Sequence, residues 1–408
     1  MSREPSRARR LFALLGLLLG LLPAQLLGIA LSTACNPANG ARGEHAAGSS
    51  TATAGAAESA GSAQIPAPTA SALGVPAPAP ASSARDGARD APGPARLELA
   101  ASGPIRVIDL HVDTPWRVHF KDRPVTLPEG HATVATLTAG HYGGVVYPIY
   151  IPDYIHDDKP EIADAEAIFA TIDKLVAAHE LLVPGFGGPV PADRVAVFVS
   201  IEGAGAFASD VGRIDEFIAR GVRLVGPAHA RDNLLAGSAT GKKRGGLTAL
   251  GKEFCERVYR AGALVDVSHL SDKSFDDVVT IARRVEAPIV ATHSNARKLR
   301  AHRRNLTDAQ LTVIKDTGGV VGLNLHRGFL GGGTMRDVVA MTKHLVRVAG
   351  VDHVAIGSDF DGGNPTSALK DAARLPELAL ALAEAGMRDA DLRKLFAENA
   401  LRILNWRR

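Results

Sequence analysis

Short runs of apolar, β-branched residues alternate with longer segments of helical periodicity from Pro104 to the end of the chain. The runs are Ile105–Leu110, Gly144–Ile151, Val195–Ile201, Val222–Pro227, Ala263–Val267, Pro288–Ala291, Val320–Leu325 and His353–Gly357. Alternation of strands with helices indicates βα units and a parallel sheet. Eight such units in roughly 300 residues predict a (β/α)8 barrel. A doubly wound open sheet is the alternative, because a count of strands does not by itself prove closure.

Two helical segments support this interpretation. Near the C-terminus, Leu392, Leu395, Phe396 and Ile403 share one face of a predicted helix. The segment Thr307–Gln310 has the Thr-x-x-Gln pattern of a capping box, which predicts that another helix begins there.

Residues able to bind a metal or transfer a proton stand where the predicted strands end. His111 and Asp113 follow the first run, and residues two apart on a strand point the same way. The other strand ends carry Glu202 (third run), His229 (fourth), His269 (fifth), His293 (sixth) and Asp359 (eighth). In a barrel the carboxyl ends of the strands meet at one rim, where active sites lie. Taken singly, each residue has a structural explanation, such as a satisfied histidine or an acid–glycine turn. Together on one rim, they favour a metal site.

The donor set suits two divalent metals rather than one. A mononuclear zinc site needs three protein ligands and a water, whereas this rim offers five ligands, His111, Asp113, Glu202, His269 and His293. Two cations that share a water-derived hydroxide would keep it deprotonated near neutral pH and polarise a carbonyl oxygen. Asp359 is then the candidate for moving protons, and His229 for donating a hydrogen bond to the developing oxyanion.

The strand-end motifs resemble those of the membrane dipeptidase (renal dipeptidase) family of the amidohydrolase superfamily. The matching segments are Val107–Trp116, Ile201–Gly203, Gly221–Asn233, Gly246–Gly251, Val265–His269, Ala291–Ser294, Arg303–Asn305 and Gly357–Gly362. Their order and spacing agree from about Pro104 to Arg408. The His-x-Asp pair after the first strand, in place of His-x-His, separates this family from most related barrels.

The resemblance implies a dipeptidase with two zinc ions and a role for each matching residue. His111 and Asp113 would bind one zinc, His269 and His293 the other, and Glu202 would bridge both. His229 would contact the substrate carbonyl region, and Asp359 would carry the proton to the leaving amine. Arg304 would pair with the C-terminal carboxylate of a dipeptide, although its sequence context alone suggests a surface residue.

Three positions depart from the family pattern. Val112 stands where Asn is common and Leu110 where Gly is common, and both changes leave the ligands in place. His326, at the end of the seventh strand, replaces an aromatic or apolar residue and could alter the pocket, so the substrate preference is open.

The first 35 residues have the pattern of an export signal. Four arginines precede an apolar stretch from Leu11 to about Leu31, and small residues follow. Ala34-Cys35 resembles the end of a bacterial lipobox, which would place lipid on Cys35. Plain cleavage and an uncleaved anchor are the alternatives. Arg9-Arg10 also resembles a twin-arginine signal. The chain is therefore expected in the cell envelope, attached to the membrane through its N-terminus or periplasmic.

Residues 36–103 are rich in Ala, Pro, Gly and Ser, which predicts a disordered tether before a catalytic domain at 104–408. The net charge of +3 gives no indication of a nucleic-acid partner. With two cysteines there is no disulfide framework, and Cys255 fits a small buried helix residue. Dipeptides are the expected substrates, and a homodimer is possible. The rival functions are hydrolysis of another small amide, such as an acylated amino acid or a lactam, and a non-catalytic surface binding protein.

Overall fold

The computed structural model describes residues 96–97, 103–186 and 189–407. The predicted export signal and nearly all of the predicted tether lie outside these residues, so both stay predictions. Among the helices of the described residues, none is both long enough and apolar enough to cross a membrane.

All eight predicted strands are present. They are β2 (Val107–Asp109), β3 (Tyr142–Tyr150), β6 (Val195–Glu202), β7 (Val222–Gly226), β8 (Leu264–Val265), β9 (Val290–Ala291), β10 (Val320–Leu323) and β11 (Val354–Ile356). The sequence pattern did not predict β4 (Leu182–Pro184), which pairs with the first half of β6, nor the two-stranded pair of β1 (Arg96–Leu97) and β5 (Pro189–Val190).

The strands follow one another around a nearly closed barrel. Their hydrogen-bonded order is β8-β7-β6-β3-β2-β11-β10-β9, and the pairs within it are parallel. A parallel bridge between Asp266 and Val290 joins β8 to β9, the two ends of that order. Neighbours in the barrel are neighbours in the sequence, which a doubly wound sheet would not give. The expected (β/α)8 architecture is therefore confirmed, and the open sheet was the wrong alternative.

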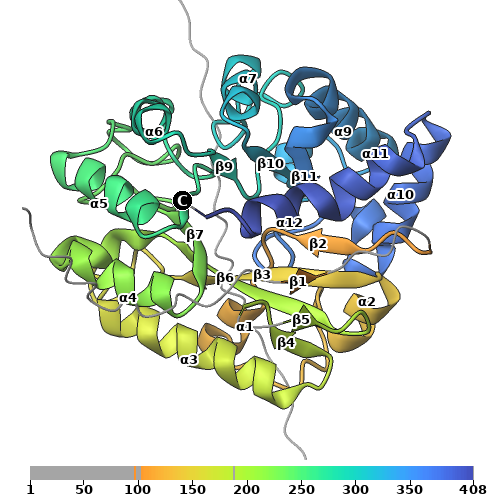
Figure 1. The fold of residues 1–408 in the computed structure, drawn as a ribbon, viewed down its shortest axis with the longest axis horizontal. Coiled ribbons are helices and arrows are strands. Elements are labelled where there is room, and N and C mark those ends of the chain that lie inside the picture. The colour runs from red at the N-terminus through yellow and green to blue at the C-terminus, as the bar shows by residue number, and fades with distance from the viewer. Residues whose placement is uncertain (1–95, 98–102, 187–188, 408) are drawn as a thin grey trace, which may run out of the picture. The chain divides into compact units, whose positions relative to one another are not determined.

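Helices surround the strands, as Figure 1 shows. The α-helices are α1 (Thr114–Phe120), α2 (Val134–Ala139), α3 (Ile162–Ala178), α4 (Ile214–Ala219), α5 (Ala249–Arg260), α6 (Asp272–Val285), α7 (Asp308–Asp316), α8 (Arg327–Leu330), α9 (Met335–Ala349), α10 (Leu375–Glu384), α11 (Asp389–Arg393) and α12 (Asn399–Leu404). Shorter helical turns are η1 (Ala204–Ser209), η2 (Val211–Arg213), η3 (Val351–His353), η4 (Ser367–Leu369), η5 (Ala372–Arg374) and η6 (Lys394–Glu398).

The core lies between the barrel and its helices. All eight residues of β6 are buried, as expected for a parallel strand covered on both faces. Phe169 of α3, Phe207 of η1 and Phe217 of α4 pack ring against ring outside the strands. Burying a large apolar side chain of this kind contributes about 1.5–3 kcal/mol, so this layer supports the barrel wall from which the strand ends project.

The predicted helix near the C-terminus is interrupted. Leu392, Leu395, Phe396 and Ile403 are all buried, but they are divided among α11, the π-helical turn η6 and α12. The capping box at Thr307 and Gln310 is present at the start of α7. Cys255 lies fully buried in α5, and burial raises the pKa of its thiol, as expected for a packing residue.

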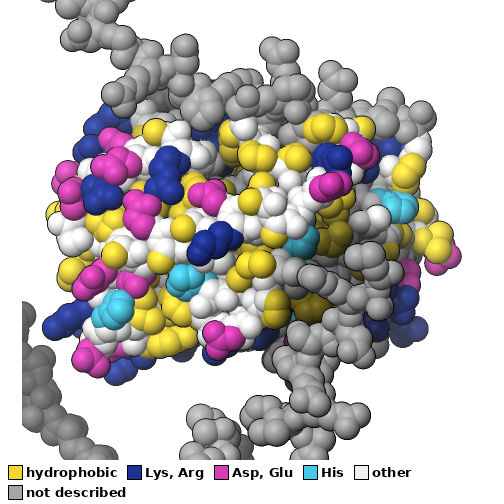
Figure 2. Space-filling view, turned by 90° about the horizontal axis from the view of Figure 1, so that it is seen from below, with side chains coloured by type: hydrophobic (Ala, Val, Ile, Leu, Met, Phe, Trp, Pro, Cys, Tyr) yellow, Lys and Arg dark blue, Asp and Glu magenta, His cyan; other side chains and the backbone are white. Residues whose placement is uncertain are grey.

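The outer helices carry charges of both signs. Figure 2 shows Lys and Arg side chains interspersed with Asp and Glu on one face of the molecule. Glu166 of α3, for example, lies 3.3 Å from Arg213 and 2.5 Å from Arg220. Exposed pairs such as these contribute little to stability.

Candidate metal centre

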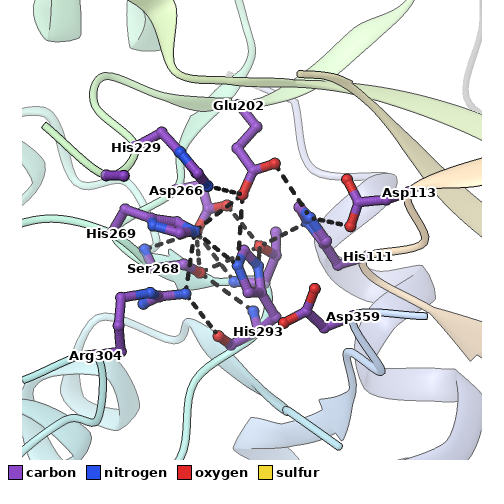
Figure 3. A network of polar contacts seen from close by, with 12 residues as sticks. His111, Asp113, Glu202, His229, Asp266, Ser268, His269, His293, Arg304 and Asp359 are labelled. Carbon is purple, nitrogen blue, oxygen red and sulfur yellow. Dashed lines mark hydrogen bonds and ion pairs between the residues drawn. The ribbon is translucent and has the colours of Figure 1, made fainter. Parts of the chain in front are cut away.

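The residues predicted at the strand ends converge at one rim of the barrel (Figure 3). Glu202 is the last residue of β6, and the others lie in the loops that directly follow their strands: His111 and Asp113 after β2, His229 after β7, His269 after β8, His293 after β9 and Asp359 after β11. Since parallel strands end on the same side, seven side chains from distant parts of the chain meet in one place.

Glu202 occupies the middle of this cluster. Its Oε1 lies 2.9 Å from Nε2 of His269 and 3.5 Å from Nε2 of His293. Its Oε2 lies 3.5 Å from Nε2 of His111 on the opposite side. The carboxylate therefore presents one oxygen to each of two nitrogen groups, and only 6% of its surface is exposed.

A second carboxylate group adjoins His111. Its Nε2 lies 3.3 Å from Oδ2 of Asp113. Ligand atoms of His111, Asp113 and Asp359 all lie within 4.8 Å of one another, and so do those of His111, Glu202 and His293 and those of Glu202, His229 and His269. The described residues thus bring together three overlapping groups able to hold a metal.

The electrostatics of the cluster fit bound cations. Burial, with Arg304 and neighbouring histidines, holds the pKa of His269 and His293 well below the ordinary value, so both imidazoles are neutral. Yet their Nε2 atoms lie only 2.9 Å apart. Burial opposes a charge on His111, but Glu202 and Asp113 raise its pKa well above the usual value. Neutral imidazole nitrogens and carboxylate oxygens directed at one another are donor atoms of the kind that a divalent metal binds.

The spacing fits as well. Ligand atoms that share a tetrahedral zinc at about 2.0–2.2 Å lie roughly 3.3–3.6 Å apart. The separations of 3.3 Å for His111 and Asp113, and of 3.5 Å from Glu202 to His111 and to His293, fall in this range. His269 lies closer, at 2.9 Å from both His293 and Glu202. The residues present therefore suit a divalent metal with nitrogen and oxygen ligands.

Asp266 supports the histidine side of the cluster. This buried carboxylate accepts hydrogen bonds from the hydroxyls of Ser268 (2.7 Å) and Thr292 (2.6 Å). The Thr292 hydroxyl in turn lies 2.8 Å from Nδ1 of His293. Outer contacts of this kind fix the orientation of a ligating imidazole. Sequence reasoning assigned no role to Asp266, and its one signal was an acid in an otherwise apolar run before His269.

Asn324 supports Asp359, and it too was missed in the sequence. Its side-chain amide donates to Oδ2 of Asp359 (3.0 Å) and to the carbonyl of His293 (3.3 Å). Burial, and next the nearby Asp113, raise the pKa of Asp359 to about 7. This carboxyl group can therefore hold or release a proton near neutral pH.

The turn after Asp359 is anchored by Asp361. Both residues have positive φ, 64° and 66°, which is uncommon outside glycine. Asp361 is buried and accepts from the Thr114 hydroxyl (2.7 Å), Arg123 (2.7 Å) and the backbone N–H of His131 (2.9 Å). It belongs to none of the metal-ligand groups and holds the turn in place behind the site.

Arg304 lies inside the molecule, unlike the surface residue that its sequence context alone suggests. Only 5% of it is exposed. Its Nη2 donates to the carbonyl of His293 (3.3 Å) and lies 3.1 Å from Nε2 of His269. Nη1 is buried and has no hydrogen-bond partner among the described residues. A guanidinium in this state is prepared to bind an anion such as a carboxylate.

His326 packs against Phe329, the same ring that lies near Arg304. Its Nδ1 accepts from the backbone of Gly328 at the start of α8, and its ring stacks on Phe329 at 4.5 Å. The guanidinium of Arg304 lies 5.7 Å from the same Phe329 ring. The unusual residue at this strand end therefore caps a helix and borders the anion-binding side of the cluster.

His229 stands at the edge of the cluster. Its Nε2 lies 3.9 Å from Oε1 of Glu202, and its Nδ1 lies 3.7 Å from Oδ2 of Asp153. Its ring packs against Tyr150 at 4.6 Å. Asp153, which sequence reasoning missed, is itself held by the backbone N–H groups of Ala230 and Arg231. Because Asp153 lies on the Nδ1 side of the His229 ring, Nε2 points toward the centre of the site, as Figure 3 shows.

The fold and the site together define a class. A parallel eight-stranded barrel with histidine and carboxylate ligands clustered at the strand ends is the architecture of a metal-dependent barrel enzyme.

Comparisons with known proteins place the chain within that class. Residues 100–406 match the family model of the membrane dipeptidases, peptidase family M19, and the chain belongs to this family. It is a metallo-dipeptidase, a hydrolase of peptide bonds. The resemblance inferred from the strand-end motifs is confirmed.

Individual relatives agree with this placement. An uncharacterised protein of the pqqA 5′ region of Klebsiella pneumoniae is 39% identical over 226 residues, covering 52% of this chain and 82% of that protein. Dipeptidase VerJ of Clonostachys rogersoniana is 28% identical over 336 residues, covering 76% and 85%. A metallopeptidase from Rhodobacter sphaeroides, solved with a phosphinate mimic of the dipeptide L-Ala-D-Ala, is 28% identical with a TM-score of 0.66, covering 74% of this chain and 100% of that one.

Proposed function

We propose that this chain hydrolyses dipeptides with the help of two zinc ions. The observation that carries the proposal is Glu202, whose two oxygens face separate sets of ligands. His111 and Asp113 would hold one ion, His269 and His293 would hold the other, and Glu202 would be shared by both. The likeness to a metallopeptidase solved with a dipeptide mimic supports the choice of substrate.

The zinc ions would supply a hydroxide at neutral pH and polarise the scissile carbonyl. The side chains of the protein bind and orient the substrate around them. Arg304 takes the C-terminal carboxylate of the dipeptide through its unpartnered Nη1, which fixes the scissile bond relative to Glu202. His229, at the edge of the site, donates a hydrogen bond to the carbonyl oxygen as negative charge develops there.

Asp359 transfers the proton. It lies in the cluster beside His111 and Asp113, where it can accept a proton during attack and deliver it to the leaving amine. Asn324 holds Oδ2 of this carboxylate, so that Oδ1 is the oxygen left to exchange the proton.

We also propose that the enzyme works in the cell envelope. The arginine-rich and apolar pattern of residues 1–35 supports export, and Cys35 is the candidate lipid attachment site. A membrane-attached protein, a plainly cleaved periplasmic one and a homodimer are all compatible with the described barrel.

A dipeptide library tested with and without a chelator examines the metal mechanism. We expect turnover of several dipeptides, loss of turnover on chelation, recovery with zinc, and two zinc ions per chain by elemental analysis. Hydrolysis that persists after complete metal removal would contradict the mechanism. A protein that contains no metal and cleaves no dipeptide after zinc is supplied would instead be a binding protein.

Replacement of Arg304 distinguishes a dipeptidase from a hydrolase of other small amides. We expect Arg304→Ala to lower kcat/KM for dipeptides by about 10²-fold or more, because a desolvated charge pair loses one partner. The same variant should have little effect on an amide substrate without a free carboxylate. Steady-state kinetics with a dipeptide and its C-terminal amide measure the difference, with zinc content as the control for an intact metal centre. Equal losses on both substrates would exclude the carboxylate-binding role.

A further inference from the structure

A cavity of about 440 Å³ lies on the same rim, between the loops that follow β9, β10 and β11. Arg300, Arg327, the segment Gly331–Gly333 and Ser367 line it. Arg300 is on the loop that carries Arg304, and Ser367 is on the loop that begins with Asp359. The cavity therefore shares its loops with the metal centre but contains none of the metal ligands.

The cavity has positive charges without acidic partners. In the described part of the chain, neither Arg300 nor Arg327 pairs with a carboxylate, and the side chain of Arg300 donates only to the carbonyl of Gly328 (3.1 Å). Other basic groups surround them. Burial first, and then Arg304, Arg300 and Arg303, lower the pKa of His302 on the same loop. Like charges gathered in this way repel one another, and a bound anion would relieve the repulsion.

Asp337, the acidic residue beside the cavity, already accepts hydrogen bonds from Thr334. A Cβ added to Gly332 would lie 2.2 Å from Oδ2 of Asp337. That oxygen accepts from the backbone N–H (2.9 Å) and the hydroxyl (2.7 Å) of Thr334, where it caps α9. Asp337 therefore caps the helix, and in the described part of the chain it forms an ion pair with neither Arg300 nor Arg327.

We propose that this cavity binds an oxyanion, a carboxylate or a phosphate, through Arg300 and Arg327. Guanidinium groups match these planar or tetrahedral oxygen arrangements with paired hydrogen bonds. The anion has two possible sources. One is an acidic side chain of the substrate, which rests on the proposed dipeptidase function and on Arg304 holding the carboxylate of the same residue. The other is a free anion that binds beside the active site.

A kinetic comparison tests the first source. Dipeptides that end in Glu are compared with those that end in Gln, in the wild type and in the R300Q/R327Q double variant. We expect the ratio of kcat/KM for the Glu substrate to that for the Gln substrate to fall by about tenfold or more in the variant, as for loss of a hydrogen-bonded charge pair. R300K/R327K should retain most of the ratio. R283Q/R284Q, which removes two exposed arginines from α6, is the charge-matched control and should leave the ratio unchanged.

Titration with inorganic phosphate tests the second source without any need for turnover. We expect calorimetry on the zinc-loaded wild type to detect phosphate binding that R300Q/R327Q loses and R283Q/R284Q keeps. Loss of phosphate binding with an unchanged Glu-to-Gln ratio identifies a free anion, and a changed ratio identifies the substrate side chain. If neither measurement separates R300Q/R327Q from R283Q/R284Q, the proposal is overturned. If the wild type cleaves no dipeptide, the proposed function fails, while the phosphate titration still decides whether the cavity binds an oxyanion.

Discussion

Glu202→Gln is expected to abolish dipeptide hydrolysis and to release bound zinc. The carboxylate lies within 2.9 to 3.5 Å of Nε2 atoms on both sides of the cluster, so its loss affects both ions at once. An amide of the same size has one neutral oxygen and an NH2 group that cannot bind a metal, so it cannot serve both sides of the cluster. Because changes outside the ligand shell already cost about 10–100-fold, loss of a shared ligand should lower kcat by about 10³-fold or more.

The measurement combines kcat for a dipeptide with zinc per chain by elemental analysis. The matched control is Glu166→Gln on α3, which makes the same chemical change on the outer surface, where Glu166 contacts Arg213 and Arg220. Circular dichroism establishes that both variants are folded. A Glu202→Gln enzyme that keeps two zinc ions and the kcat of the wild type would rule out a bridging role.

Much of this architecture was predictable from the pattern of apolar residues. Each strand of the barrel is a short β-branched run buried on both faces, and this signal is local in the sequence. The unpredicted β4 has only three residues and ends in a proline, and it pairs with the first half of β6 outside the barrel order. The barrel strands β8 and β9 are shorter still, but each lies in a longer apolar run, whereas Leu181–Val183 is a run of three residues between a glutamate and a proline. The pairing of β4 with β6 therefore depends on the tertiary fold rather than on a local pattern.

The position of the candidate ligands was predictable for a topological reason. Parallel strands end on one side, so residues just after each run had to meet, whatever their separation in the sequence. The alternation of side chains also accounts for the departures from the family pattern. Leu110 and Val112, on either side of His111, are completely buried in the core, while His111 and Asp113 point to the cluster.

The supporting residues were not predictable in the same way. The role of Asp266 depends on Thr292 from the next strand end, and that of Asn324 depends on Asp359, 35 residues away. Such contacts are fixed only when the barrel assembles. The burial of Arg304 was not predictable either. A guanidinium is usually found at the surface, and here it is buried only because the assembled loops around it exclude solvent.

Gly362→Ala is the second change for which we expect a large effect, although this residue is neither a ligand nor a proton donor. A Cβ at this position would lie 2.1 Å from Oδ2 of Asp113 and 2.6 Å from Oδ1 of Asp359. These distances are below any van der Waals contact, so at least one of the two carboxylates has to move. The backbone of Gly362 is also tied to the carbonyl of Asp359 (3.3 Å), which leaves it little freedom to retreat.

We expect Gly362→Ala to lower kcat by about 10²-fold, because misplacement of a reacting group by about 1 Å costs on this order. Stability should fall by only about 1–3 kcal/mol, the usual cost of overpacking. The zinc content shows which carboxylate has moved. Displacement of Asp113 should release about one ion per chain, whereas displacement of Asp359 alone should leave both ions bound. Gly245→Ala is the matched control, because a Cβ there meets nothing within 4 Å. If Gly362→Ala retains both zinc ions and a kcat within threefold of the wild type, the close fit of this turn against the two carboxylates does not matter for catalysis.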